Sequence, residues 1–395
     1  MPANKPPFDG EWVKLGELIS KAPIERCGDA KYPVYSMTMR DGIVEQAGRF
    51  KKAIASKDTS SYKVVKKNQL VVGFPIDEGV IYVQNHDAPG IMSPAYNVWN
   101  IDLGRVDPSY LEFALHGPRS MAYYADKMRG TTARRRTLTA DGLREMEILL
   151  PSADGQIRVV NTLDEVRSLI EGASGQIAML DTLVKSRFVE MFRDPVSNEM
   201  GWPASTIKET AIIYGDGPFG SNLKSSDYVD EGARVIRLGN IQQGYFSEKD
   251  QSFVSYEKYE QLNRYKCSPG EIVIATLGSP ILRACLVPDS CDPSIHKADC
   301  MYYEVDRDRL VPTFAMCVIN HPSMLRRAAA DVHGQTRGRI NSTQTGALPM
   351  ILPPLALQQE FASFVAEVDK SRYIVQQKIE KLQTLYDSLA QEYFG

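Results

Sequence analysis

The sequence repeats itself at an interval close to half its length. Residues 177–192 (IAMLDTLVKSRFVEMF) and 379–394 (IEKLQTLYDSLAQEYF) match at seven of sixteen positions with an offset of 202. The matched positions in the first copy are Ile177, Leu180, Thr182, Leu183, Ser186, Glu190 and Phe192. A repeat unit of this size indicates a duplicated half rather than a solenoid of short units. The chain is therefore expected to fold as two similar halves in a pseudo-twofold arrangement.

The segments that precede these two stretches also match each other. Residues 108–112 (PSYLE) and 312–316 (PTFAM), at an offset of 204, both read as helices with proline in the first turn. The same offset pairs Pro118 with Pro322, Gly130 with Gly334, Thr132 with Thr336, Arg135 with Arg339 and Gly142 with Gly346. Each half thus predicts a mixed globular region followed by a long helix.

The end of the chain is a long stretch without helix breakers. No proline follows Pro354, and the only later glycine is Gly395. An apolar seam alternates in steps of four and three and is interrupted only at Arg372. At about 1.5 Å per residue, a helix of about thirty-four residues would span roughly 50 Å. A seam of that length needs a partner, and the first half carries the same alternation from Val159 to Val184.

We therefore expect two long helices that pack antiparallel as an intramolecular coiled coil. The predicted interface residues are Leu163, Val166, Ile170, Ile177, Leu180, Val184, Val368, Val375, Ile379, Leu382, Tyr386 and Leu389. Strand-like runs at 64–73, 80–84, 234–238, 271–277 and 284–287 make the expected fold class α+β. The predicted domains are 1–151 (first globular domain), 152–193 (central helix), 194–353 (second globular domain) and 354–395 (C-terminal helix).

Composition restricts the class of protein. The chain is 43% hydrophobic and 24% charged, and it has no apolar run near eighteen residues, so we expect a soluble cytoplasmic protein with no membrane partner. Its six cysteines include no C-x-x-C pair and are expected to be reduced. The group Cys285, Cys291, His296 and Cys300 fits no common zinc spacing, so ordinary strand and loop cysteines explain it better than a metal site.

Two short motifs suggest catalysis, but their context argues against it. Residues 215–220 (GDGPFG) fit the dinucleotide pattern G-x-G-x-x-G, yet no βαβ unit surrounds them, and a turn-rich loop is the better explanation. Residues 107–110 (DPSY) differ by one residue from the tetrad of amino-methyltransferases. Their counterpart 311–314 (VPTF) lacks the acid, so a helix start explains both copies. We expect a chain without catalytic residues and without a bound cofactor or metal.

Local positive charge is more informative than the net charge of −3. Seven basic and two acidic residues lie between Arg119 and Arg144, and Arg326, Arg327, Arg337 and Arg339 occupy the equivalent stretch of the second half. Such clusters are often solvated surface, but here both copies place basic residues after a glycine–threonine loop at the same site. Arginine can hold phosphate or read guanine, so both stretches are candidate DNA contacts. The amides of Gln335, Asn341 and Gln344 could contact adenine or could be ordinary loop groups.

At this point the sequence resembles a specificity subunit of a type I restriction–modification system. The resemblance covers nearly the whole chain and is most specific in the second half. It rests there on residues 201–203 (GWP), 217–224 (GPFGSNLK), 236–241 (IRLGNI), 270–274 (GEIVI) and 352–360 (LPPLALQQE). The first half departs more, with 150–153 (LPSA) in place of a full Leu-Pro-Pro. Such divergence is expected if the two globular domains read different DNA half-sites.

The resemblance implies a set of roles. The domains 1–151 and 194–353 would be target recognition domains that each read half of a bipartite site in double-stranded DNA, and the paired helices would be the spacer. The helices would also hold two modification subunits, which carry S-adenosylmethionine and methylate adenine. Restriction or motor subunits would use ATP and Mg²⁺ to cut the DNA. The candidate DNA-binding residues are Arg129, Arg134, Arg135, Arg136, Ser221, Asn222, Lys224, Gln335, Thr336, Arg337, Arg339 and Asn341.

Two other classes of function remain open from the residues. The chain could be a two-domain scaffold or adaptor whose helices assemble partners without reading DNA. It could also be a free-standing enzyme such as a methyltransferase, which the missing motifs disfavour. A spacer of roughly 50 Å corresponds to about fifteen base pairs, which suits two domains on successive major-groove faces.

Overall fold

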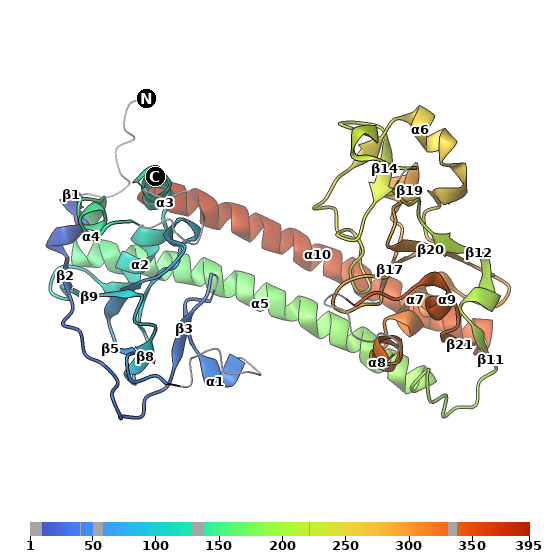
Figure 1. The fold of residues 1–395 in the computed structure, drawn as a ribbon, viewed down its shortest axis with the longest axis horizontal. Helices are drawn as coiled ribbons and strands as arrows, with labels where there is room; N and C mark the ends of the chain where they lie inside the picture. Colours follow the sequence, from blue (N-terminus) through green and yellow to red (C-terminus); the bar gives the residue numbers. More distant parts are fainter. Residues whose placement is uncertain (1–9, 40, 50–57, 128–137, 221, 331–337) are drawn as a thin grey trace. The chain divides into compact units, whose positions relative to one another are not determined.

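The computed structural model of the chain (Figure 1) describes residues 10–39, 41–49, 58–127, 138–220, 222–330 and 338–395. The fold is α+β, as the sequence predicts, with several small sheets and two helices of forty residues, α5 (Ala153–Phe192) and α10 (Leu355–Phe394). The chain divides into two compact units. Unit 1 comprises residues 1–174 and 377–395, and unit 2 comprises residues 175–376. Each unit therefore contains a segment of both long helices.

Unit 1 is built around a four-stranded antiparallel sheet. Its strands lie in the order β2 (Ile19–Lys21), β9 (Asn97–Ile101), β6 (Gln69–Val72), β7 (Ile81–Val83). Three two-stranded pairs accompany it: β1 (Gly10–Lys14) with β10 (Glu147–Pro151), β3 (Tyr35–Met37) with β4 (Ile43–Glu45), and β5 (Lys63–Val65) with β8 (Gly90–Met92). Its shorter helices are α1 (Gln46–Arg49), α2 (Pro108–His116), α3 (Pro118–Lys127) and α4 (Ala140–Arg144).

Unit 2 repeats this plan and adds a sheet. Its antiparallel four-stranded sheet has the order β12 (Ala211–Asp216), β20 (Cys300–Val305), β17 (Ile272–Ala275), β18 (Arg283–Leu286). A five-stranded sheet has the order β13 (Tyr228–Val229), β15 (Phe253–Val254), β14 (Ala233–Ile236), β19 (Ser294–His296), β16 (Lys266–Cys267). Strand β11 (Ala204–Thr206) pairs with β21 (Pro349–Ile351), and the helices are α6 (Tyr256–Gln261), α7 (Pro312–Ile319), α8 (Pro322–Ala330) and α9 (Ser342–Gly346). Taken in chain order, the four-stranded sheets of the two units have the same topology.

One predicted strand is divided in the structure. The run 64–73 was expected to be continuous, but it forms β5 and β6 with Asn68 between them at a φ of +64°. Asparagine tolerates this left-handed conformation better than most residues. The turn at Asn68 lets β5 pair with β8 while β6 joins the four-stranded sheet.

A buried glutamine anchors the first turn of each long helix. In unit 1 the Gln156 amide donates to the carbonyl oxygens of Arg105 and Pro151, both at 3.1 Å, and its Oε1 accepts from the Asp107 amide at 2.7 Å. In unit 2 the Gln358 amide donates to the carbonyl oxygens of Arg309 at 3.0 Å and Pro353 at 2.8 Å. Its Oε1 accepts from the Val311 amide at 2.9 Å. These partners correspond at the offsets of 202 and 204, so the sequence repeat is also a repeat of hydrogen bonds.

Aromatic residues at the ends of the long helices close the cores of both units. In unit 1 Phe394 lies 5.7 Å from Tyr110 between ring centroids and packs against Gly117, where an added Cβ would lie 2.4 Å from the Phe394 Cβ. In unit 2 Phe192 lies 4.8 Å from Phe314, the residue equivalent to Tyr110. Each long helix is therefore fixed at its last turn by the aromatic residue of an α2-like helix.

Two ion pairs show that the long-helix segments of unit 2 run antiparallel. In unit 2 Arg187 pairs with Glu360 at 2.8 Å and Arg372 pairs with Asp181 at 2.6 Å, so residue numbers rise on one helix as they fall on the other. Arg372 also pairs with Asp369. The break in the seam is thus an ion pair between helices, and the Arg372 side chain is 23% exposed.

The predicted interface residues of the two long helices are all buried or half-buried. Leu163, Val166 and Val368 are buried, and the other nine are half-buried. In unit 1, Leu389 and Tyr386 pack against the cluster that contains Leu163. Among the described helices, none has the length and apolarity that a membrane crossing requires.

The packing of Phe394 yields a stability prediction. Replacing Phe394 with alanine should lower the free energy of unfolding of unit 1 by about 3 kcal/mol, because a buried aromatic ring leaves a cavity. Urea titration followed by hydrogen exchange of unit 1 measures the change. Leu385→Ala is the matched control, since Leu385 lies on the same helix with 47% of its surface exposed. Equal stability of the two variants would contradict this packing.

Candidate nucleic-acid interface

The glycine-rich loop after β12 is shaped by a close backbone approach. The Gly217 amide donates to the Cys300 carbonyl oxygen at 3.1 Å. An added Cβ at Gly217 would lie 2.3 Å from the carbonyl carbon and oxygen of Lys297, so no other residue fits without movement. The loop is followed by a 3-10 turn, Ser225–Asp227, and enters an antiparallel arrangement rather than a βαβ unit. The G-x-G-x-x-G pattern is therefore structural, as the sequence context predicts.

Three segments distant in sequence meet at this loop. The segment 338–341 lies beside the end of β17, because the Ile340 amide donates to the Thr276 carbonyl oxygen at 3.0 Å. From this segment Arg339 places its Nη2 2.9 Å from Asp299 Oδ1, close enough for an ion pair but not aligned as a hydrogen bond. Its guanidinium carbon also lies 5.8 Å from the centroid of the Phe219 ring. We call Phe219, Asp299 and Arg339 the loop cluster of unit 2.

Charge around the loop cluster is only slightly positive. The described cations on its segments are Lys224, Lys297 and Arg339, with Arg283 nearby on β18, and the described carboxylates are Asp216, Asp227 and Asp299. Lys297 places its ammonium 5.2 Å from the Tyr228 ring centroid. The described part of this surface therefore carries individual cationic and aromatic side chains, but its summed charge is too small for a strong positive potential.

The four predicted DNA contacts within the described residues have different environments. Asn222 and Lys224 are exposed on the loop after Gly217, and Arg339 belongs to the loop cluster. Asn341 caps α9 instead, because its Oδ1 accepts from the Gln344 amide at 2.8 Å. The Asn341 amide in turn donates to Gln344 Oε1 at 3.1 Å, so both side chains hold a helix start. Contact of these residues with DNA stays a prediction.

The other eight predicted contacts lie outside the described residues. These are Arg129, Arg134, Arg135, Arg136, Ser221, Gln335, Thr336 and Arg337.

At the start of the basic stretch 119–144 of unit 1, Arg119 stacks over the Trp12 ring at 4.3 Å and lies 3.9 Å from Glu147. Lys127 pairs with Asp126 at 3.2 Å. These two described cations thus already have partners within unit 1.

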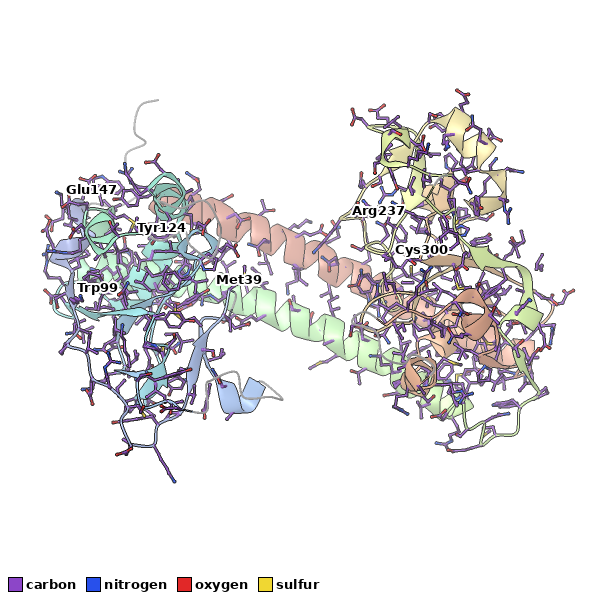
Figure 2. All side chains as sticks on the ribbon, in the orientation of Figure 1. Met39, Trp99, Tyr124, Glu147, Arg237 and Cys300 are labelled. Atoms are coloured by element: carbon purple, nitrogen blue, oxygen red, sulfur yellow. The ribbon has the colours of Figure 1, made fainter. Side chains whose placement is uncertain are left out.

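The thiols near His296 form part of a buried core. Cys285 and Cys300 lie on strands of the four-stranded sheet, and Figure 2 marks Cys300 there. Burial raises the pKa of the Cys285 thiol to about 12 and lowers the pKa of His296 to about 4, so both groups are neutral at pH 7. Cys267 Sγ lies 3.4 Å from His296 Nδ1. In the described ranges no group of His, Cys, Asp and Glu side chains is arranged to hold a metal ion.

The segments 107–110 and 311–314 both form the start of a helix. Asp107 caps α2 by accepting from the Ser109 and Tyr110 amides at 2.9 and 3.0 Å, and Tyr110 is fully buried. The helix starts predicted at Pro108 and Pro312 are confirmed. The resemblance to a methyltransferase tetrad is thus explained by helix capping.

Sequence reasoning did not identify Phe219, Lys297 or Asp299 as site residues. Phe219 lies inside the motif 217–224, but its 51% exposure could be known only from the fold. Asp299 and Lys297 sit in a turn between β19 and β20, far in sequence from Arg339. No local pattern in the sequence indicates that pairing.

Comparison with known structures shows a shared fold. The chain is similar to the type I restriction–modification S subunit of M. genitalium, with 15% identity and a TM-score of 0.53 over 100% of this chain and 98% of that one. It is also similar to a protein from a study of complex assembly and conformational transition in the type I R-M system. That match has 17% identity and a TM-score of 0.54 over 99% of both chains. The sequence matches no protein-family model and no curated protein.

The resemblance inferred from sequence is therefore confirmed at the level of the fold. A third match, the HsdS subunit of Thermoanaerobacter tengcongensis, has 16% identity over 100% of this chain and 98% of that one. Its TM-score of 0.36 is too low to support a common fold. The shared fold rests on the first two matches, which cover nearly the whole of this chain.

The close approach at Gly217 yields a second prediction. Gly217→Ala should destabilise unit 2 by about 2 kcal/mol, because its Cβ would force the Lys297 backbone to move. Gly215→Ala is the control, since a Cβ there meets no atom within 4 Å. Hydrogen exchange of residues 175–376 under urea compares the two variants. If both variants matched the parent chain, the loop would not depend on this contact.

Proposed function

We propose that the chain is the DNA specificity subunit of a type I restriction–modification complex. The observation that carries the proposal is the duplicated unit: two sheets of one topology and two glutamine anchors of one pattern, in a fold shared with S subunits along the full chain. A chain with two similar recognition units suits a DNA target made of two half-sites. Domain 1–151 would read one half and domain 194–353 the other, while the helices 152–193 and 354–395 set their spacing.

Contacts with partner subunits are proposed for the long helices. In unit 2, Met179 and Leu183 lie four residues apart on α5 and are 73% and 48% exposed. Tyr373 and Ile374 on α10 are 67% and 68% exposed. Met179 and Leu183 share one helix face, and exposed apolar side chains on an otherwise polar surface favour a docked protein partner. The proposed occupants are two modification subunits, with restriction or motor subunits bound to the complex in turn.

Catalysis is assigned to those partners. S-adenosylmethionine would be bound by the modification subunits, and ATP and Mg²⁺ by the motor subunits. This chain would act by positioning: its recognition domains hold the target and its helices place the methyltransferases over the half-sites. The proposed enzyme activities thus belong to the complex and not to this chain alone.

The alternative is a scaffold that assembles partners without reading DNA. The small excess of positive charge around the loop cluster favours this reading, since DNA-binding surfaces are usually strongly basic. The two functions differ in what the assembled complex does to DNA, because a scaffold would add no sequence preference.

Co-expression with an adenine methyltransferase subunit followed by mapping of methylated bases tests the proposal. The chain should co-purify with that subunit, and methylation should occur at a motif with two half-sites and a fixed gap. Omitting the chain is the control and should abolish methylation of the motif. Co-purification without a bipartite motif would favour the scaffold. Absence of both would reject the proposed function.

A further inference from the structure

Phe219 is an exposed aromatic residue on a loop whose shape is fixed from both sides. The residue is 51% exposed. On one side, Pro218 restricts the backbone and Gly217 packs against the Lys297 backbone. On the other side, the Asn222 amide donates to the Phe219 carbonyl oxygen at 3.0 Å, and Gly220 adopts a φ of +35°. The fold therefore holds an apolar ring in water instead of letting the loop collapse over it.

A guanidinium stands beside this ring and is itself held in place. The Arg339 guanidinium carbon is 5.8 Å from the ring centroid, within the range of a cation–π contact. Asp299, on a different segment, lies 2.9 Å from Arg339 Nη2 and restrains the side chain. The ring and the cation are thus brought together by three separate segments of unit 2. Other exposed aromatic residues of the unit, such as Tyr256 at 62%, have no such cation in the described contacts.

An apolar ring next to a fixed cation can bind a nucleotide in two parts, with the base at the ring and the phosphate at the cation. Bases stack on aromatic rings or are separated by apolar wedges, and guanidinium groups bind the phosphate that follows. A partner helix would instead require several apolar side chains at helical spacing, and the loop cluster offers one. The occupant favoured by these groups is therefore a nucleobase with its adjoining phosphate.

We propose that Phe219 makes an apolar contact with a base of the DNA half-site read by unit 2, while Arg339 binds the neighbouring phosphate. This inference rests on the proposed function and adds the mode of contact. Asp299 is then a positioning residue, since it acts on DNA only through Arg339.

The two groups should have different signatures in DNA binding. Loss of the Phe219 ring removes a contact that releases no counterions, so affinity should fall about tenfold with an unchanged slope of log affinity against log salt. Loss of Arg339 removes a phosphate contact, so affinity should fall and the magnitude of the salt slope should decrease by about one. Phe219→Leu should restore much of the affinity, because leucine can also act as a wedge.

The test uses the full chain with its modification subunit and a synthetic duplex that carries the mapped methylation motif. Affinity is measured at several salt concentrations for the parent chain, Phe219→Ala, Phe219→Leu, Arg339→Ala and the control Tyr256→Ala. Thermal unfolding checks that each variant is folded. A Phe219→Trp variant adds a direct readout, since fluorescence of a tryptophan that contacts a base should be quenched when the duplex binds.

The outcomes distinguish a failure of the inference about Phe219 from a failure of the proposed function. If the parent chain binds the motif and Phe219→Ala binds equally well, or the tryptophan is not quenched, the inference is wrong and the proposed function stands. If Phe219→Ala loses the modification subunit instead of DNA affinity, Phe219 belongs to a protein interface and the inference is also wrong. If the parent complex shows no preference for any duplex, the proposed function fails together with it.

Discussion

The buried glutamine at the start of each long helix is the interaction on which both units depend. One carboxamide joins three backbone groups: the carbonyl oxygen at the end of an edge strand, the carbonyl oxygen of the turn before an α2-like helix, and the amide at that helix start. Removing a buried amide partner leaves unsatisfied groups that cost about 1–3 kcal/mol each. The carboxamide therefore fixes where the long helix leaves the globular part, and its partners recur in the second unit.

The far end of each helix is held by packing rather than by hydrogen bonds. Phe192 and Phe394 enter the cores beside Phe314 and Tyr110. Between the ends, most of the predicted interface residues are half-buried, and an ion pair between Arg372 and Asp181 joins the helices of unit 2. Exposed apolar residues such as Met179 remain available on the outer faces. The last turn of each long helix is thus fixed by packing within the unit that contains it.

Much of the fold could be predicted because it depends on local patterns. Proline at a helix start, a four-three apolar alternation and an internal match need only neighbouring residues or a fixed offset, and the helix starts at Pro108 and Pro312 are confirmed. Strand pairing was less accessible, since β14 pairs in parallel with β19 across almost sixty intervening residues, and Asn68 divides a run that reads as one strand.

The candidate site was predicted less well than the fold. Arg339 was identified from charge, but its partners Asp299 and Phe219 come from segments that only tertiary structure brings together. Asn341 was predicted to contact a base, but in the structure its side-chain oxygen caps helix α9. A basic or amide side chain indicates a possible contact, whereas the geometry around it decides which role that side chain can take.

The most direct test of the account is to lengthen both long helices together by one heptad, within the seam, and to map the methylated motif again. Seven added residues extend a helix by about 10 Å, which corresponds to about three base pairs. If the paired helices are the spacer between two recognition units, the gap between the half-sites should grow by about that amount while the half-sites stay the same. An unchanged gap in a folded, active complex would contradict the account.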